Sequence, residues 1–106
     1  MQTVQEKEII NEMKALCEDL ILWRASPENQ NYKLIFNIHH NAQALEDDKK
    51  SYKNFNKINF NDILEKYNEF SIENLSNFKW VNQYCLKYLY YYSDANLKFD
   101  ITNGGI

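Results

Sequence analysis

The pair His39–His40 is the place in the sequence where residue types could support acid–base or metal chemistry. Imidazole titrates near neutral pH and is a common zinc ligand. Adjacent helical residues point about 100° apart, so the two rings could not readily bind one ion. His39 lies near Gln43 and Glu46 on a helix, but zinc needs three or four ligands. We therefore expect a core histidine with satisfied hydrogen bonds at position 39, no metal and no cofactor.

Motifs that carry catalysis are missing from the sequence. The one glycine pair, Gly104–Gly105, lies near the end of the chain and cannot form a phosphate-binding loop before a helix. No GxSxG, CxxC or HExxH pattern is present. The carboxylates are scattered over outward helical positions, where they are usually solvent-facing charges. The sequence therefore predicts a protein that is not an enzyme.

Two cysteines, Cys17 and Cys85, lie within apolar helical patterns. Two cysteines do not make the disulfide framework of a small secreted domain. We expect two buried free thiols. A Cys17–Cys85 bridge between packed helices is the alternative.

An aromatic stripe in the last predicted helix is the strongest hint of function. Trp80, Tyr84 and Tyr91 share one side of that helix, beside Lys87 and about 100° from its core stripe. Tyr and Trp carry much of the energy of protein interfaces, because they bury a large area and keep a polar group. The stripe predicts a partner-binding surface or a homodimer seam. The alternative is that the first two helices cover it.

A lysine-rich segment suggests a second kind of partner. Basic side chains interleaved with aromatic rings can follow phosphates and stack bases. The residues are Lys49, Lys50, Tyr52, Lys53, Phe55 and Lys57. Three acidic residues directly precede them and cancel most of the local charge. We therefore keep nucleic-acid binding as the alternative hypothesis.

The chain is mildly acidic, with a net charge of −3. An acidic surface suits a target with a basic groove and speeds association by electrostatic steering. We expect that surface on the first two helices. Its candidate residues are Glu12, Glu18, Asp19, Glu46, Asp47 and Asp48.

The first predicted helix covers residues 3–24. Thr3 and Glu6 have the spacing of a capping box, which satisfies two backbone donors at the helix start. Apolar residues then recur every three or four positions, and charges occupy the other side. The apolar stripe comprises Ile9, Met13, Leu16, Leu20 and Trp23, widened by Ile10 and Cys17.

The second predicted helix covers residues 27–47. Ser26 and Pro27 form a start signal. Residues 32–38 alternate in a strand-like way, but Ile35 breaks the alternation, and the length favours a helix. A strand at 32–38 pairing with 97–101 would instead give an α+β fold.

The second half of the chain predicts two further helices. Residues 48–60 lose periodicity and indicate a loop or short irregular helix. Asn61 is expected to cap a short helix that reaches residue 70, and Ser71 to cap the last helix, 71–92. Residues 97–101 alternate as a short extended tail, and 102–106 are expected to fray. Short connections favour antiparallel neighbours, so we predict a mainly α, four-helix bundle-like domain.

Length and composition agree with one compact domain. The chain has 106 residues, 44% hydrophobic and 15% aromatic, with 2 Gly and 1 Pro, unlike a disordered chain.

No signal-peptide pattern and no long apolar run is present, so we expect a cytoplasmic protein away from membranes. Frequent Asn, Lys, Ile and Tyr suggest an AT-rich bacterial or phage source.

Together these observations favour a small non-catalytic protein-binding module. An inhibitor, immunity protein or anti-defence protein that occludes a partner surface has this size and charge. The sequence does not identify the partner and leaves self-association open. A nucleic-acid-associated regulator that uses residues 49–57 is the alternative.

Overall fold

The computed structural model describes residues 3–25 and 32–92, with side chains described through residue 87. The protein is mainly α-helical, as predicted, and neither described range contains a strand. Residues 32–38 are helical, so the α+β alternative is wrong. The predicted extended tail lies outside the described residues. The elements are α1 Val4–Ala25, α2 Tyr32–Ser51, η2 Phe55–Lys57, α3 Asn61–Lys66, α4 Ile72–Leu75 and α5 Phe78–Tyr92.

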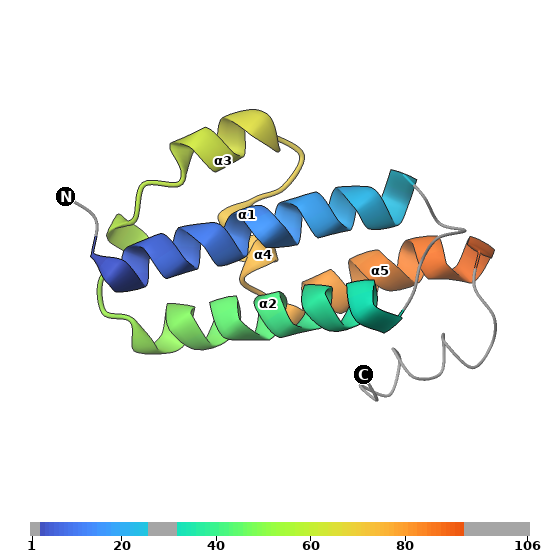
Figure 1. Cartoon of the computed structure of the whole chain (residues 1–106), viewed down its shortest axis with the longest axis horizontal. Coiled ribbons are helices and arrows are strands. Elements are labelled where there is room, and N and C mark those ends of the chain that lie inside the picture. The colour runs from blue at the N-terminus through green and yellow to red at the C-terminus, as the bar shows by residue number, and fades with distance from the viewer. Residues whose placement is uncertain (1–2, 26–31, 93–106) are drawn as a thin grey trace.

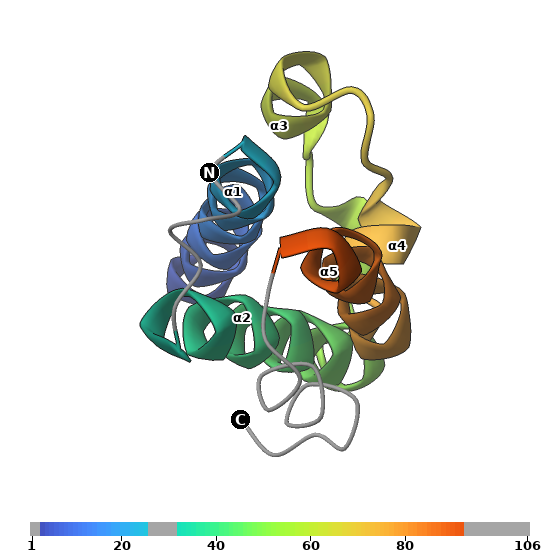
Figure 2. The same cartoon turned by 90° about the vertical axis from the view of Figure 1, so that its right-hand side faces the viewer.

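Three long helices form the body of the molecule. α1 and α2 run antiparallel side by side, and α5 packs against both, so an end view shows a triangle (Figures 1 and 2). α3 lies outside the triangle beside α1, and α4 leads into α5 (Figure 2). The bundle-like prediction therefore holds, whereas its count of four helices is not confirmed in the described residues.

α1 forms where the capping and apolar patterns place it, with one of the two predicted capping bonds among the hydrogen bonds described. The Thr3 hydroxyl accepts a hydrogen bond from the Glu6 backbone N–H at 3.1 Å, which satisfies one free donor at the helix start. The apolar stripe then faces the core. Its buried members are Ile9, Met13, Leu16, Cys17, Leu20 and Trp23.

α2 continues four residues beyond the predicted end at residue 47. The Ser51 hydroxyl donates to the Asp47 carbonyl oxygen at 2.8 Å, and Lys49 and Lys50 place positive charge at the negative end of the helix dipole. These local interactions sustain a helix where apolar periodicity has already ended. The predicted loop is therefore shorter than the sequence suggested and contains the single turn η2.

The predicted last helix is two helices. Ser71 caps α4 as expected, since its hydroxyl accepts from Asn74 N–H at 3.1 Å. The Ser76 hydroxyl then donates to the Ile72 carbonyl at 2.7 Å, and Asn77 Oδ1 accepts from Trp80 N–H at 3.1 Å. Both are side-chain interactions that compete with a continuous helix. The chain therefore turns before α5 begins.

The start of α3 also differs by one residue from the prediction. Asn61 is the first helical residue, not the cap, because Phe60 occupies the cap position. The Asn59 side-chain oxygen accepts from the Asn61 N–H at 2.9 Å. The asparagine that supplies the capping interaction thus lies two residues earlier.

Trp23 anchors the end of the core where α1 meets α5. Its side chain is fully buried, and its indole N–H donates to the Cys85 carbonyl at 3.3 Å. Cys17 and Cys85 are buried free thiols, so the bridged alternative is wrong. Burial raises the pKa of Cys17 to about 12 and raises the pKa of Cys85 as well.

No helix within residues 3–25 and 32–92 has the length and apolar character needed to cross a bilayer.

Candidate protein-interaction surface

The predicted aromatic stripe of α5 is half-buried. Phe70, in the turn after α3, lies edge-on against Trp80 and Tyr84, with ring centroids 6.2 and 5.6 Å away. Trp80 and Tyr84 lie 5.4 Å from each other. Phe70 itself is buried in the core. These three rings form one cluster that holds the 67–71 turn against α5.

The polar group of Tyr84 also has an internal partner. Arg24, near the end of α1, donates to the Tyr84 hydroxyl at 3.2 Å and forms a two-pronged ion pair with Glu69. The second prong, Arg24 Nη2 to Glu69 Oε1, measures 2.8 Å. Hydrogen bonding from Arg24 lowers the pKa of Glu69. Of the other predicted residues, Lys87 is exposed and the Tyr91 side chain lies outside the described residues.

The lysine segment exposes its lysine side chains, whereas its two aromatic residues are buried or half-buried. Phe55 is only 3% exposed, so the prediction that it stacks on bases is wrong. Tyr52 is half-buried, and its hydroxyl donates to Glu6 Oε1 at 2.9 Å. Lys50 pairs with Glu46 at 3.4 Å. The three remaining lysines of the segment, Lys49, Lys53 and Lys57, are exposed.

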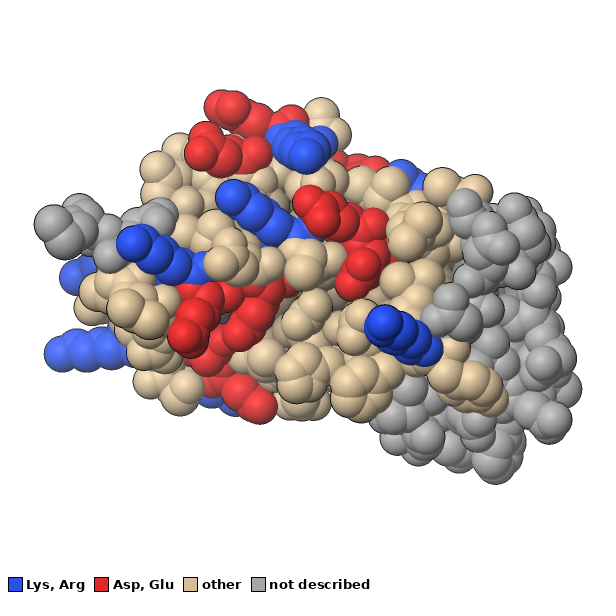
Figure 3. Space-filling model, viewed as in Figure 1, with Lys and Arg blue, Asp and Glu red and all other residues tan. Residues whose placement is uncertain are grey.

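Acidic side chains gather in the seam between α1 and α2 (Figure 3). Burial, the charge of Asp48 and a hydrogen bond between the two carboxyl groups raise the pKa of Glu12 to about 7, with a contribution from Glu8. Burial also raises the pKa of Asp48. The Glu12 carboxyl is therefore partly protonated near neutral pH.

The other predicted acidic residues have mixed surroundings. Glu46 turns inward: its Oε2 accepts from the Phe78 backbone N–H at 3.0 Å and ties α2 to the start of α5. Asp47 accepts from Gln43 at 3.1 Å, and Glu18 accepts from Tyr67 at 3.4 Å. Burial beside Glu18 raises the pKa of Asp19. Several of the predicted acidic side chains thus form hydrogen bonds within the fold.

The Glu12 carboxyl makes stability depend on pH. A group whose pKa is higher in the folded state stabilises the fold below its unfolded pKa, here 4.5, and loses that effect as pH rises through about 7. Glu12→Gln mimics the protonated form. We expect it to raise the melting temperature by about 5 °C at pH 8, discounted for partial exposure, and to have little effect at pH 4.5.

Glu65→Gln, at an exposed carboxylate of α3, is the matched control and should leave the melting temperature unchanged at both pH values. Circular dichroism melts of the three proteins measure the difference. An equal gain for Glu12→Gln at both pH values would show that the Glu12–Asp48 pair is not the source.

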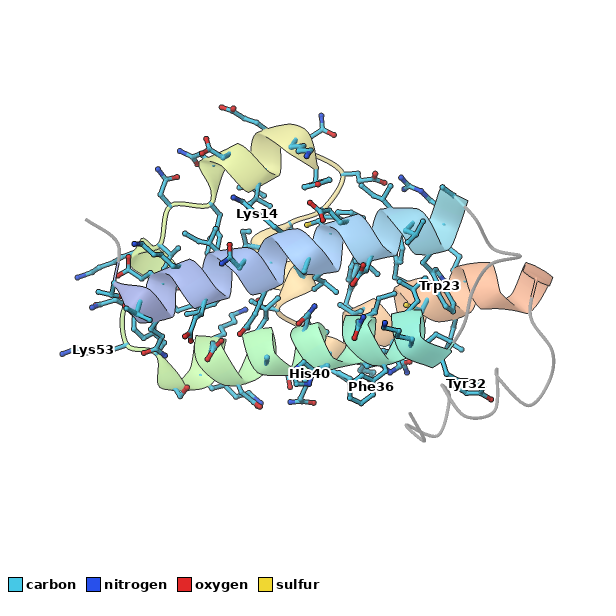
Figure 4. All side chains as sticks on the ribbon, viewed as in Figure 1. Lys14, Trp23, Tyr32, Phe36, His40 and Lys53 are labelled. Carbon is cyan, nitrogen blue, oxygen red and sulfur yellow. The ribbon has the colours of Figure 1, made fainter. Side chains whose placement is uncertain are left out.

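A surface that the sequence analysis missed lies on α2. Tyr32 and Phe36 are each 55% exposed and lie one helical turn apart. His40, one turn further, is exposed and stacks on Phe36, with ring centroids 5.8 Å apart and planes 13° apart. The three side chains follow the edge of α2 that points away from α1 (Figure 4). We call Tyr32, Phe36 and His40 the aromatic face.

A shallow pocket of about 290 Å³ adjoins the aromatic face. Phe36, His40 and Gln43 contribute from α2, together with the buried His39, and Phe78 contributes from the first turn of α5. The His39 ring meets Phe78 edge-on, with centroids 5.2 Å apart. Burial lowers the pKa of His39, so its imidazole is neutral at pH 7.

Within the described residues, no group of three or more His, Cys, Asp or Glu side chains could hold a metal ion. His39 is buried against Phe78, as the sequence predicted, but the prediction that its hydrogen bonds are satisfied is wrong for Nε2, which has no partner. No family model, curated protein or solved structure matches the chain.

Proposed function

We propose that this chain is a small protein-binding module that occludes a surface of its partner with the aromatic face of α2. The exposure of Tyr32 and Phe36 supports this proposal more than any other observation. Both residues are 55% exposed in a protein that buries or half-buries most of the other aromatic side chains described. Adjacent exposed rings on a rigid helix are typical of interface centres.

The helix beneath the aromatic face makes it a suitable binding surface. The opposite side of α2 places Ile35, Ile38, Ala42 and Leu45 in the core, so the backbone under the exposed rings is fixed by packing. A rigid helix presents its side chains with little loss of conformational entropy on binding. An apolar groove or flat patch on the partner would complement it.

The charge of the chain bears on the kind of partner. A net charge of −3 favours a partner with a basic surface, such as a nucleic-acid-binding protein. The chain would then act on that partner as an inhibitor, immunity protein or anti-defence protein. The same charge, together with the buried Phe55, counts against nucleic acid as the direct ligand.

A tagged pull-down from source cells, with and without nuclease, tests the proposal. A stoichiometric protein that survives nuclease and is lost with Phe36→Asp is the expected result. A variant carrying Glu at Lys49, Lys53 and Lys57 should retain the partner, because these residues lie in the last turn of α2 or beyond it, whereas the aromatic face begins at the first residue of α2. Loss of all captured material on nuclease treatment would instead support the nucleic-acid hypothesis.

Sedimentation velocity of the purified chain distinguishes self-association. A dimer that Phe36→Asp converts to a monomer would make the partner a second copy of this chain. A monomer at all concentrations would direct the proposal to a different protein.

A further inference from the structure

We propose that the pocket beside His39 receives the phenol ring of a tyrosine side chain from the partner protein, with its hydroxyl hydrogen-bonded to His39 Nε2. This inference rests on the proposed function and specifies its chemistry. The pocket is lined by Phe36, His39, His40, Gln43 and Phe78.

The first argument is the unpartnered nitrogen. His39 is 5% exposed, and its Nε2 is buried with no hydrogen-bond partner in the described part of the chain. Buried polar groups are nearly always hydrogen-bonded, because leaving one unpaired destabilises the fold. Two other buried side-chain atoms in the described residues, Glu12 Oε2 and Asn82 Oδ1, also have no partner. Of the three residues, His39 is the one that lines a described pocket, so a group from another molecule could reach it there.

The second argument concerns the polarity of the ligand. Burial keeps His39 neutral at pH 7, so Nε2 either donates or accepts, according to the tautomer. A hydroxyl can meet both forms, since it is both a donor and an acceptor. A charged group would lose its hydration among aromatic rings without gaining an opposite charge. A neutral hydroxyl therefore fits Nε2 better than a carboxylate or an ammonium.

The third argument is the shape of the walls. Phe36 and His40 form a stacked pair, Phe78 meets the His39 ring edge-on, and all four rings line the pocket. Aromatic walls favour a flat ring in stacked or edge-on contact. A volume of about 290 Å³ lies at the lower limit of small-molecule sites and suits a single side chain. A phenol combines this shape with the hydroxyl.

A larger hollow elsewhere lacks these features. About 440 Å³ lies between η2, α3 and α4, beside Asn56, Asn59, Phe60 and Leu64. Asn59 already accepts from the Asn61 N–H, and none of the described side chains lining this hollow has a buried polar atom without a partner. The pocket at His39 is thus distinguished by an unmet hydrogen bond and not by its size.

Entry to Nε2 requires movement at the rim. The exposed side chains there, Phe36, His40 and Gln43, can change rotamer without disturbing the core. Such side-chain adjustments are common when interfaces form.

The test uses the protein alone, with p-cresol as the tyrosine side chain and toluene as the same ring without the hydroxyl. Binding is followed by chemical shifts of the His39 imidazole and the Phe78 ring in NMR titrations. We expect p-cresol to bind about five-fold more tightly than toluene, the effect of one hydrogen bond to a buried group. Equal binding, or no shift with either probe, would overturn the proposal.

His39→Phe keeps an aromatic ring and removes Nε2. We expect it to abolish the preference for p-cresol, to leave toluene binding within two-fold, and to raise the melting temperature because the unpaired buried atom is gone. His40→Phe, at the exposed neighbour, should keep the preference. If His39→Phe does not fold, the comparison of the two probes on the natural chain still decides.

Failure of this proposal and failure of the proposed function are separable. The pull-down with Phe36→Asp does not depend on either probe. A captured partner together with equal p-cresol and toluene binding would retain the function and reject the tyrosine pocket.

Discussion

Phe36→Asp is expected to weaken the complex with the captured partner by about 30-fold or more, while thermal unfolding stays within 2 °C of the natural chain. The loss corresponds to the ~2 kcal/mol that marks an interface hot spot. A carboxylate at this position would be desolvated against an apolar partner. The fold should tolerate the change because the ring is 55% exposed. Calorimetric titration and circular dichroism melts measure the two quantities.

Leu22→Asp is the matched control. Leu22 is 51% exposed on α1, so the substitution places the same charge on another exposed apolar residue. It should leave partner affinity within about two-fold, the size of an ordinary surface effect. Equal losses with both variants would contradict a binding surface centred on α2.

The double substitution Trp80→Ala with Tyr84→Ala is expected to destabilise the fold by about 3–5 kcal/mol. Two half-buried rings would be lost, and with them their contacts to Phe70 and the hydrogen bond from Arg24. That loss is a large share of the stability of a domain of this size. Urea unfolding measures it, with Lys79→Ala on the exposed side of α5 as the control.

The same double variant discriminates between two roles of the stripe. If the stripe is chiefly structural, stability falls and any loss of partner follows unfolding. If helical content and stability remain unchanged while the partner is lost, the stripe is the interface that its spacing first suggested. The second outcome would move the binding surface from α2 to α5.

Local signals predicted the first helix well. Thr3 and Glu6 lie in a spacing that directly encodes a hydrogen bond, and the apolar stripe has one consistent side. Ser71 also caps as expected. Patterns of this kind depend on residues within one or two turns, so the sequence alone contains the information.

The break before α5 depended on interactions that periodicity does not show. The apolar pattern runs from Leu75 to Phe78 without a visible interruption. The side chains of Ser76 and Asn77 between them nevertheless hydrogen-bond to the backbone and turn the chain. The start of α5 is also held by Glu46, 32 residues earlier, through the Phe78 N–H. A contact between distant residues cannot be read from a local window.

The aromatic face was hidden for a related reason. Tyr32 and Phe36 lie in a segment whose apolar residues cover most sides of a helical wheel. The sequence pattern therefore does not distinguish the side of the helix that faces the core from the side that faces solvent. The fold makes that distinction by packing Ile35, Ile38 and Leu45 inward. Conversely, Trp80 and Tyr84 looked unpartnered because Phe70 reaches them only after the chain has folded.

Cross-saturation NMR on the complex with the captured partner tests the central claim most directly. The labelled chain is observed while the unlabelled partner is irradiated, so side chains in contact lose signal. The account predicts the largest losses at Tyr32, Phe36 and His40, with little loss on the exposed side of α3. Losses centred on Trp80, Tyr84 and Lys87, with the aromatic face unaffected, would contradict it.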